Sequence, residues 1–132
     1  MKLLLVTSPG GHLYSIFMLK EWWKKYDRVW VCPNSADEKY LLKKEKWIKG
    51  YGPENRSLKN LIKNLCLAWK VIKQEKPDLI FSCGAAMAPP FFWIGKILGV
   101  KSVFLETYDF VESASLSAWL VMPVATHILV QH

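Results

Sequence analysis

The chain has 132 residues, of which 52% are hydrophobic, 14% aromatic and 22% charged, and its formal net charge is +7. This length predicts a single domain with a sizeable core. Three widely spaced cysteines argue against a disulfide framework or a cysteine zinc site, and no stretch has the roughly 20 apolar residues of a membrane-spanning helix. The apolar run after Met1 is too short for a signal peptide, so we expect a cytoplasmic protein.

Strands and helices are predicted to alternate along the whole chain. A buried strand over residues 2–7 leads through a turn into a helix over residues 12–25. Further strands are expected at residues 28–32, 46–51, 78–82, 100–105 and 126–130, and further helices at residues 37–44, 57–75, 91–98 and 115–121. This order predicts an α/β fold with a Rossmann-like, doubly wound and mostly parallel sheet.

The positive charge is concentrated in residues 39–76. This segment has eleven lysines and arginines against three glutamates, a net charge of +8, and the rest of the chain nearly balances. Two interpretations fit: a solvated helix face, or a surface that lies against anionic lipid head groups. The seven tryptophans add to a composition that suits a nucleic-acid, membrane or protein partner.

The segment 57–75 gives the clearest helical pattern. Its apolar residues recur at spacings of three and four, which predicts an amphipathic helix. Those residues are Leu58, Leu61, Ile62, Leu65, Trp69 and Ile72, and Lys59, Lys63, Lys70 and Lys73 occupy much of the opposite side. Lys59, Lys63, Trp69 and Lys70 are candidates for a surface that faces a membrane and a membrane-bound acceptor.

The loop after the first strand is typical of a binding site for a phosphate or a sugar hydroxyl. Gly10 and Gly11 permit a sharp turn and a close ligand, and the helix that follows offers unpaired N–H groups. The loop lacks the third glycine of a dinucleotide fingerprint and the Lys-Ser/Thr pair of a P-loop. His12 fits a general base, a hydrogen-bond partner of a diphosphate or a helix-capping residue, and Ser8 is a further candidate contact.

Two later loops also follow strands, and in such sheets ligands bind beyond the carboxyl ends of the strands. Gly84 and Ala85 leave room for a ligand, although close packing explains them equally well. Glu106, which is followed by Thr107, could accept a proton or bind hydroxyls, or it could be a solvated acid, and Ser113 adds a hydroxyl. The spacing indicates neither a metal site nor a serine or cysteine nucleophile.

Seven motifs in register resemble one known family. They are residues 3–12 (LLLVTSPGGH), 27–31 (DRVWV), 55–61 (NRSLKNL), 76–80 (KPDLI), 84–99, 105–107 (LET) and 130–131 (VQ). The chain is similar to the bacterial polysaccharide-biosynthesis subunits called β-1,4-glycosyltransferase enhancer or accessory proteins. These are related to the membrane-anchor subunit of the dolichol-linked N-acetylglucosaminyltransferase, and the resemblance covers essentially the whole chain.

The resemblance implies the N-terminal, acceptor-side half of a split GT-B glycosyltransferase, a single Rossmann-like domain over residues 1–132. A nucleotide-sugar-binding catalytic subunit would complete the heterodimer. The pair would move a hexosyl or N-acetylglucosaminyl group, with inversion, from a UDP-linked donor to a lipid-linked acceptor in polysaccharide or oligosaccharide biosynthesis. The donor is a co-substrate and no cofactor is implied. The subunit would lie at the cytoplasmic face of the membrane as a peripheral protein.

By position, the resemblance gives His12 and Glu106 catalytic roles in the cleft. The family usually has an arginine where this chain has Phe110, a basic residue near Trp119 and an aspartate near Thr126. These differences leave open a non-catalytic scaffold of the same family that recruits a partner glycosyltransferase. A basic α/β nucleic-acid binder is a third class, but the sequence has no recognisable nucleic-acid-binding motif.

Overall fold

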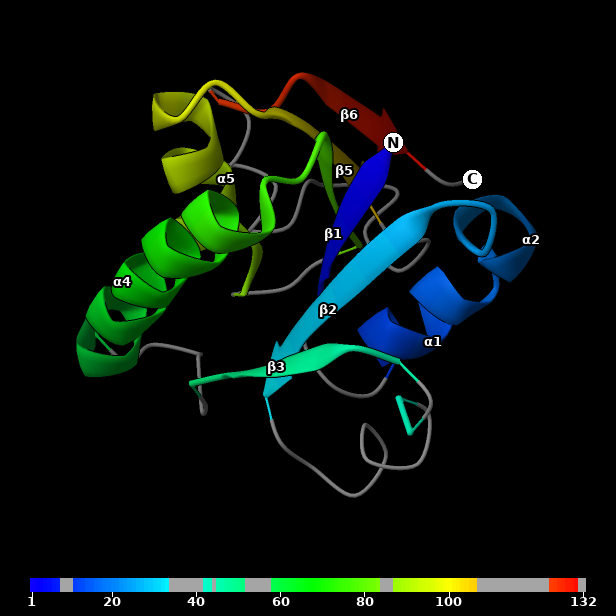
Figure 1. The fold of residues 1–132 in the computed structure, drawn as a ribbon, viewed down its shortest axis with the longest axis horizontal. Helices are drawn as coiled ribbons and strands as arrows, with labels where there is room; N and C mark the ends of the chain where they lie inside the picture. The colour runs from blue at the N-terminus through cyan, green and yellow to red at the C-terminus, as the bar shows by residue number, and fades with distance from the viewer. Residues whose placement is uncertain are drawn as a thin grey trace.

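The computed structural model describes residues 1–7, 11–33, 42–43, 45–51, 58–83, 87–106 and 124–130, with backbone only at residues 11, 12, 106 and 128–130. Strands and helices alternate along these ranges (Figure 1). The elements are β1 (Lys2–Val6), α1 (Gly11–Phe17), α2 (Lys20–Trp23), β2 (Asp27–Pro33), β3 (Trp47–Gly50), α4 (Leu58–Glu75), β4 (Leu79–Ser82), α5 (Ala88–Ile97), β5 (Lys101–Glu106) and β6 (His127–Val130).

The described strands form one sheet in the order β3-β2-β1-β4-β5-β6, and every neighbouring pair is parallel. From β1 the chain first builds outward through β2 and β3, and then returns to the other side of β1 to place β4, β5 and β6. This is the doubly wound order of a Rossmann-like domain, so the predicted fold class is confirmed. The direction of growth reverses between β1 and β4.

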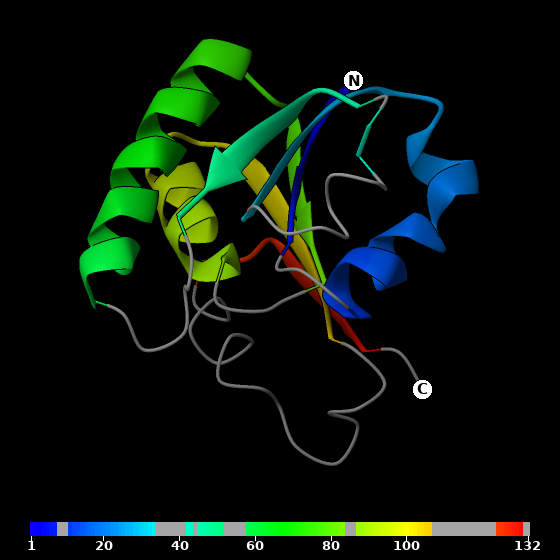
Figure 2. The ribbon, with the colours of Figure 1, turned by 90° about the horizontal axis from the view of Figure 1, so that it is seen from below.

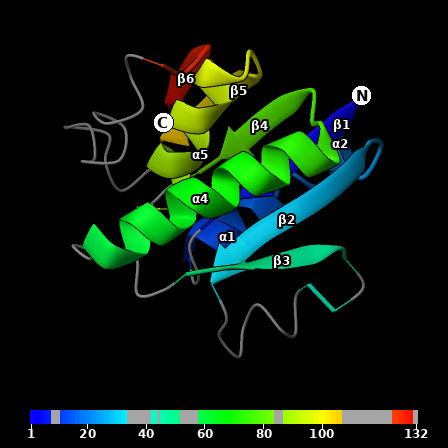
Figure 3. The same ribbon diagram turned by 60° about the vertical axis from the view of Figure 1, so that its left-hand side comes forward.

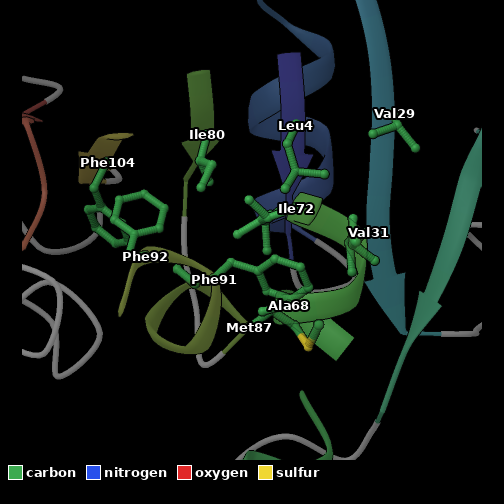
Figure 4. Packing of buried hydrophobic residues seen from close by; sticks show 13 residues of the cluster. Leu4, Val29, Val31, Ala68, Ile72, Ile80, Met87, Phe91, Phe92 and Phe104 are labelled. Carbon is green, nitrogen blue, oxygen red and sulfur yellow. The ribbon is translucent and has the colours of Figure 1, made fainter. Parts of the chain in front are cut away.

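Helices cover both faces of the sheet. Helices α4 and α5 lie on one face, and α1 and α2 lie on the other (Figures 1 and 2). Because side chains alternate along a strand, Leu4 and Val6 of β1 pack toward α4 and α5, in the cluster of Figure 4, whereas Leu3 and Leu5 pack toward α1 and α2. All four are fully buried, which explains why β1 is a continuous apolar run.

Most of the described tryptophans belong to the core. The ring of Trp30 in β2 stacks on Phe17 at a centroid distance of 5.2 Å and meets Trp23 edge-on, also at 5.2 Å. Of the six tryptophans in the described ranges, Trp69 alone is exposed. The aromatic content that suggested an external partner therefore serves largely to fill the space between α1, α2 and the sheet.

The prediction of one continuous helix over residues 12–25 is wrong, because the segment forms two short helices. The break lies at Leu19, whose N–H donates to the carbonyl of Ile16 at 2.9 Å, a tighter turn than in an α-helix. The buried Trp23 indole also donates to that Ile16 carbonyl, at 2.8 Å. These two donors satisfy the carbonyl that a continuous helix would have paired with Lys20.

The predicted helix over residues 57–75 is confirmed as α4, but its apolar row does not lie wholly against the core. The fully or nearly buried residues of this helix are Asn64, Ala68, Val71, Ile72 and Glu75. Leu58, Ile62 and Trp69 are exposed by 71%, 54% and 43%. At 100° per residue, the arc of α4 that the sheet and α5 bury is rotated by about 80° from the centre of the apolar row, and Ile72 is the one fully or nearly buried residue that belongs to both.

Helix α5 begins at Ala88, earlier than the predicted residue 91, because Pro89 and Pro90 fit the first turn of a helix, where no backbone N–H is needed. It ends at Ile97, and the predicted stop residue Gly99 follows with a φ of 78°, which suits glycine. The N–H of Val100 then donates to Gly95 at 2.8 Å and closes the helix end.

The strands predicted at 46–51 and 126–130 are confirmed as β3 and β6. Of the helix predicted over residues 37–44, the described part is Leu42 and Lys43, which form a turn. The helix predicted over residues 115–121 lies outside the described ranges. Within those ranges, no helix has both the length and the apolar character needed to cross a membrane.

A buried carboxylate fastens the end of α4 to the sheet. The Glu75 side chain is 4% exposed, and it accepts hydrogen bonds from Lys46 Nζ at 2.8 and 3.0 Å and from Lys2 Nζ at 2.9 Å. The backbone N–H of Lys2 donates to Asp78 Oδ2 at 2.7 Å, and the N–H of Asp78 donates to the carbonyl of Lys2 at 2.8 Å. The starts of β1 and β4 and the end of α4 are thereby held together.

We predict that Glu75→Gln lowers the free energy of unfolding by about 2 kcal/mol, because charge-assisted hydrogen bonds from two lysines are weakened in a buried site. Urea unfolding measures the change. Glu21→Gln is the matched control, since Glu21 pairs with Lys24 on the surface, and the unfolding midpoint should not move. Equal midpoints for Glu75→Gln and wild type would contradict the proposed role.

The same variant tests a pH dependence. Hydrogen bonds from Lys46 and then Lys2 hold the pKa of Glu75 below its ordinary value. A lowered folded-state pKa contributes stability that is fully present above the unfolded-state pKa and is lost as the pH falls through the folded-state pKa. The stability gap between wild type and Glu75→Gln should be constant near neutral pH and shrink below about pH 4.

A close contact between α5 and β4 gives a second stability prediction. A Cβ added at Gly95 would lie 2.5 Å from Cδ1 of the fully buried Ile80. Gly95→Ala should therefore destabilise the fold by about 1–2 kcal/mol, although alanine favours a helix. Ile80→Val removes the obstructing methyl group, so in that background Gly95→Ala should cost nothing or stabilise. Additive effects in the double-mutant cycle would contradict the contact.

Candidate functional site

The three predicted loops leave the sheet from three adjacent strands. Strands β1, β4 and β5 end at Val6, Ser82 and Glu106, and they are neighbours in the sheet. Parallel neighbours lie about 4.8 Å apart, so these three strand ends span about 10 Å of the carboxyl edge. The edge includes the point between β1 and β4 where sheet growth reverses, which is where ligands bind in open α/β sheets.

The backbone positions of both predicted catalytic residues lie at this edge. Gly11 is the first residue of α1 and His12 the second, in the segment that follows β1. Glu106 is the last residue of β5 and pairs with Val130 of β6. Their side chains lie outside what the structure describes, as do the predicted substrate contacts Ser8, Gly10, Gly84, Ala85, Thr107 and Ser113. The proximity of the strand ends is thus established, and the side-chain roles remain predictions.

Backbone pairing continues beyond the end of β1. Thr7 is fully buried, and its N–H donates to the carbonyl of Val31 at 3.0 Å. The indole N–H of Trp47 in β3 donates to the carbonyl of Cys32 in β2 at 2.9 Å. These bonds fix the point from which the first loop departs.

A contact that has no signal in the sequence holds the residue that follows the loop after β4. Met87 is fully buried and comes immediately before α5. It lies so close to Gly50, at the end of β3, that a Cβ at residue 50 would overlap Met87 Cε. A contact between residues this far apart in sequence leaves no local pattern, so only the structure reveals that β3 and the start of α5 meet near the carboxyl edge.

The cysteine at the carboxyl edge of the sheet does not have the properties of a nucleophile. Cys83 follows β4, is buried, and burial raises the pKa of its thiol to about 12. A thiol with this pKa is almost entirely protonated near neutral pH and is a poor nucleophile. In the part of the chain that the structure describes, no group of three histidine, cysteine or acidic residues is placed to hold a metal ion.

The predicted membrane-side residues form a separate set on α4. Lys59, Lys63 and Lys70 are exposed, as is Trp69. They lie along the helix rather than at the strand ends. In the first half of α4, the side chain of Asn64 accepts a hydrogen bond from the N–H of Tyr51 at 2.9 Å and donates to the carbonyl of Tyr51 at 3.1 Å, which ties the helix to the segment that follows β3.

No family model and no curated protein matches the sequence. Solved structures do match the fold. MurG from Acinetobacter baumannii superposes with a TM-score of 0.76 and 19% identity, over 100% of this chain and 42% of that one. A UDP-GlcNAc 2-epimerase from Methanocaldococcus jannaschii gives 0.75 and 12%, over 100% and 40%.

A third match is the apo form of the lipopolysaccharide outer core galactosyltransferase WaaB, with a TM-score of 0.64 and 14% identity, over 96% of this chain and 38% of that one. At such identities the likeness establishes the fold, which is that of a Rossmann-like domain of GT-B proteins. The chain spans about two fifths of the length of the structures it matches.

Thiol labelling tests the description of Cys83. Cys66 lies exposed on α4, whereas Cys32 and Cys83 are buried. We predict that one thiol of the folded protein reacts rapidly with iodoacetamide, that Cys66→Ser removes this reaction, and that three thiols of the wild type react in urea. Rapid modification of Cys83 in the folded protein would show that it is an activated nucleophile after all.

Proposed function

We propose that this chain is the acceptor-side subunit of a two-chain glycosyltransferase. A partner subunit binds the nucleotide sugar, with a UDP-linked donor as co-substrate, and the pair transfers a sugar to a lipid-linked acceptor in polysaccharide or oligosaccharide biosynthesis. The subunit works at the cytoplasmic face of a membrane as a peripheral protein. Its single domain supplies one wall of the cleft, and the partner supplies the other.

One observation gives this proposal its main support: the strand ends that lead to His12, Gly84 and Glu106 are neighbours at the reversal point of the sheet. That place is the usual ligand site of the fold class. The described edge has a buried, protonated cysteine and no metal-ligand cluster, and these features do not compete with an acid–base role for His12 or Glu106.

The fold matches support a glycosyl-transfer setting. Two of the similar structures are named as MurG and as a galactosyltransferase, and this chain spans about two fifths of each. A partner of comparable size would complete a two-domain cleft. The motif resemblance to accessory glycosyltransferase subunits points to the same division of labour.

The transfer chemistry requires a base and an electrophilic site. In the proposal, His12 or Glu106 removes the proton of the acceptor hydroxyl as that oxygen attacks the anomeric carbon. The bond between that carbon and the diphosphate breaks, and the nucleoside diphosphate departs. Backbone N–H groups of the glycine loop stabilise the negative charge on the leaving group.

A non-catalytic scaffold of the same family is the second candidate. Phe110 stands where the family usually has an arginine, which favours this alternative. In that case the chain recruits the partner to its acceptor and contributes no group to the reaction.

Reconstitution separates the two candidates. The chain is co-expressed with a candidate nucleotide-sugar-binding partner, and transfer to a lipid-linked acceptor is measured. We predict that His12→Ala or Glu106→Ala lowers kcat by about 100-fold or more, because removal of a general base has effects of this size. Tyr14→Ala, on the exposed side of α1, and Glu21→Gln are the matched controls.

Both variants must still co-elute with the partner for the comparison to count as a catalytic effect. Full turnover by both variants would assign the chain to the scaffold class. Failure of wild type to pair with any nucleotide-sugar-binding protein would overturn the proposed division into two chains.

A further inference from the structure

Helix α4 lies on the outside of the molecule (Figure 3). Apolar and cationic side chains are exposed together on its outer face. We define the α4 outer face by seven of the exposed residues of the helix, the apolar and cationic ones: Leu58, Lys59, Ile62, Lys63, Trp69, Lys70 and Lys73. At 100° per residue, Leu58, Ile62 and Trp69 fall in one row along the helix, and the four lysines fall in the adjoining row. This arrangement leaves three large apolar side chains in water.

The charge of this face has one sign. The single acidic residue of α4 is Glu75, which is buried and bonded to Lys2 and Lys46. Lysine Nζ atoms also lie over exposed aromatic rings: Lys73 over Trp69 at 5.2 Å, and Lys63 over Tyr51 at 5.4 Å from the ring centroids. The aromatic rings and lysine stems can pack against apolar material while the ammonium groups stay in a polar layer.

We propose that the α4 outer face docks on an anionic lipid bilayer. A row of apolar and aromatic residues beside a row of lysines is typical of a helix that lies in the plane of a membrane interface. A protein partner fits less well, because lysine is depleted at the centres of protein interfaces. A nucleic acid would satisfy the lysines and leave Leu58 and Ile62 unburied.

The position of α4 makes this docking useful to the candidate site. The helix is about 27 Å long and runs opposite to the strands (Figure 2). Its first half lies toward the carboxyl edge of the sheet, where Asn64 bonds Tyr51, and its last residue, Glu75, bonds Lys2 at the amino edge. A bilayer along α4 brings membrane-borne head groups to the edge that holds the three loops. This inference rests on the proposed function, because the orientation brings the site near its acceptor only if the acceptor is linked to a lipid.

Vesicle sedimentation with the purified full chain tests the docking directly. Wild type is mixed with phosphatidylcholine vesicles or with vesicles of equal parts phosphatidylcholine and phosphatidylglycerol. We expect binding to the anionic vesicles that weakens as salt is added. Lys59→Gln combined with Lys63→Gln should lower the partition coefficient about 25-fold, because each lysine near an anionic surface contributes about fivefold. Ile62→Ala combined with Trp69→Ala should also lower it.

Matched controls come from other exposed positions. Lys25→Gln with Lys101→Gln removes the same charge away from α4, and Met18→Ala truncates an apolar residue that is 83% exposed beyond α1. Both controls should bind anionic vesicles as wild type does. All variants are exposed-site changes, and their circular dichroism should match that of wild type.

Two results of the vesicle assay would overturn the proposal: wild type that does not bind anionic vesicles, or α4 variants that bind them as wild type does. If those variants also fail to co-elute with the partner subunit, α4 is a protein-docking surface instead. The vesicle assay contains neither partner nor nucleotide sugar, so its failure is distinct from failure of the proposed function, which transfer to a water-soluble acceptor tests without a membrane.

Discussion

The parallel pairing of β1 with β4 is the constraint on which the other features depend. Leu3, Leu4 and Leu5 pair with Leu79, Ile80 and Phe81, and this pairing forces the chain to cross from one side of β1 to the other. The crossing places helices on both faces of the sheet, and β1 and β4 at its centre are buried from their second residue onward. It also leaves the carboxyl ends of β1 and β4 side by side with no strand between them, and this is where the candidate site lies.

Helix α4 performs that crossing, and its sequence meets more than one demand. Ala68, Val71 and Ile72 fill the narrow space above the sheet, and Glu75 fixes the end of the helix through Lys2 and Lys46. The exposed Leu58, Ile62 and Trp69 are not among these buried contacts. Their place beside four lysines is the observation on which the proposed docking to a bilayer rests.

The sequence predicted what local patterns determine. Apolar runs such as residues 2–7 and stop signals such as Gly99 identified the strands, the end of α5 and the fold class. It did not predict the break at Leu19, which depends on the Trp23 indole competing for a backbone carbonyl, or the exposure of Leu58 and Ile62, which depends on how much of α4 the sheet and α5 cover. At the candidate site, strand order confirmed that the loops share an edge, but the Gly50–Met87 contact is long-range and left no sequence signal.

The central claim is that this domain forms half of a cleft. The most direct measurement is calorimetric titration of UDP-sugars into the chain alone, into the partner alone, and into the complex of the two. The account predicts no saturable binding to the chain alone and the tightest binding to the complex. Tight binding of a nucleotide sugar to the isolated chain, followed by its turnover without partner or lipid, would contradict the account.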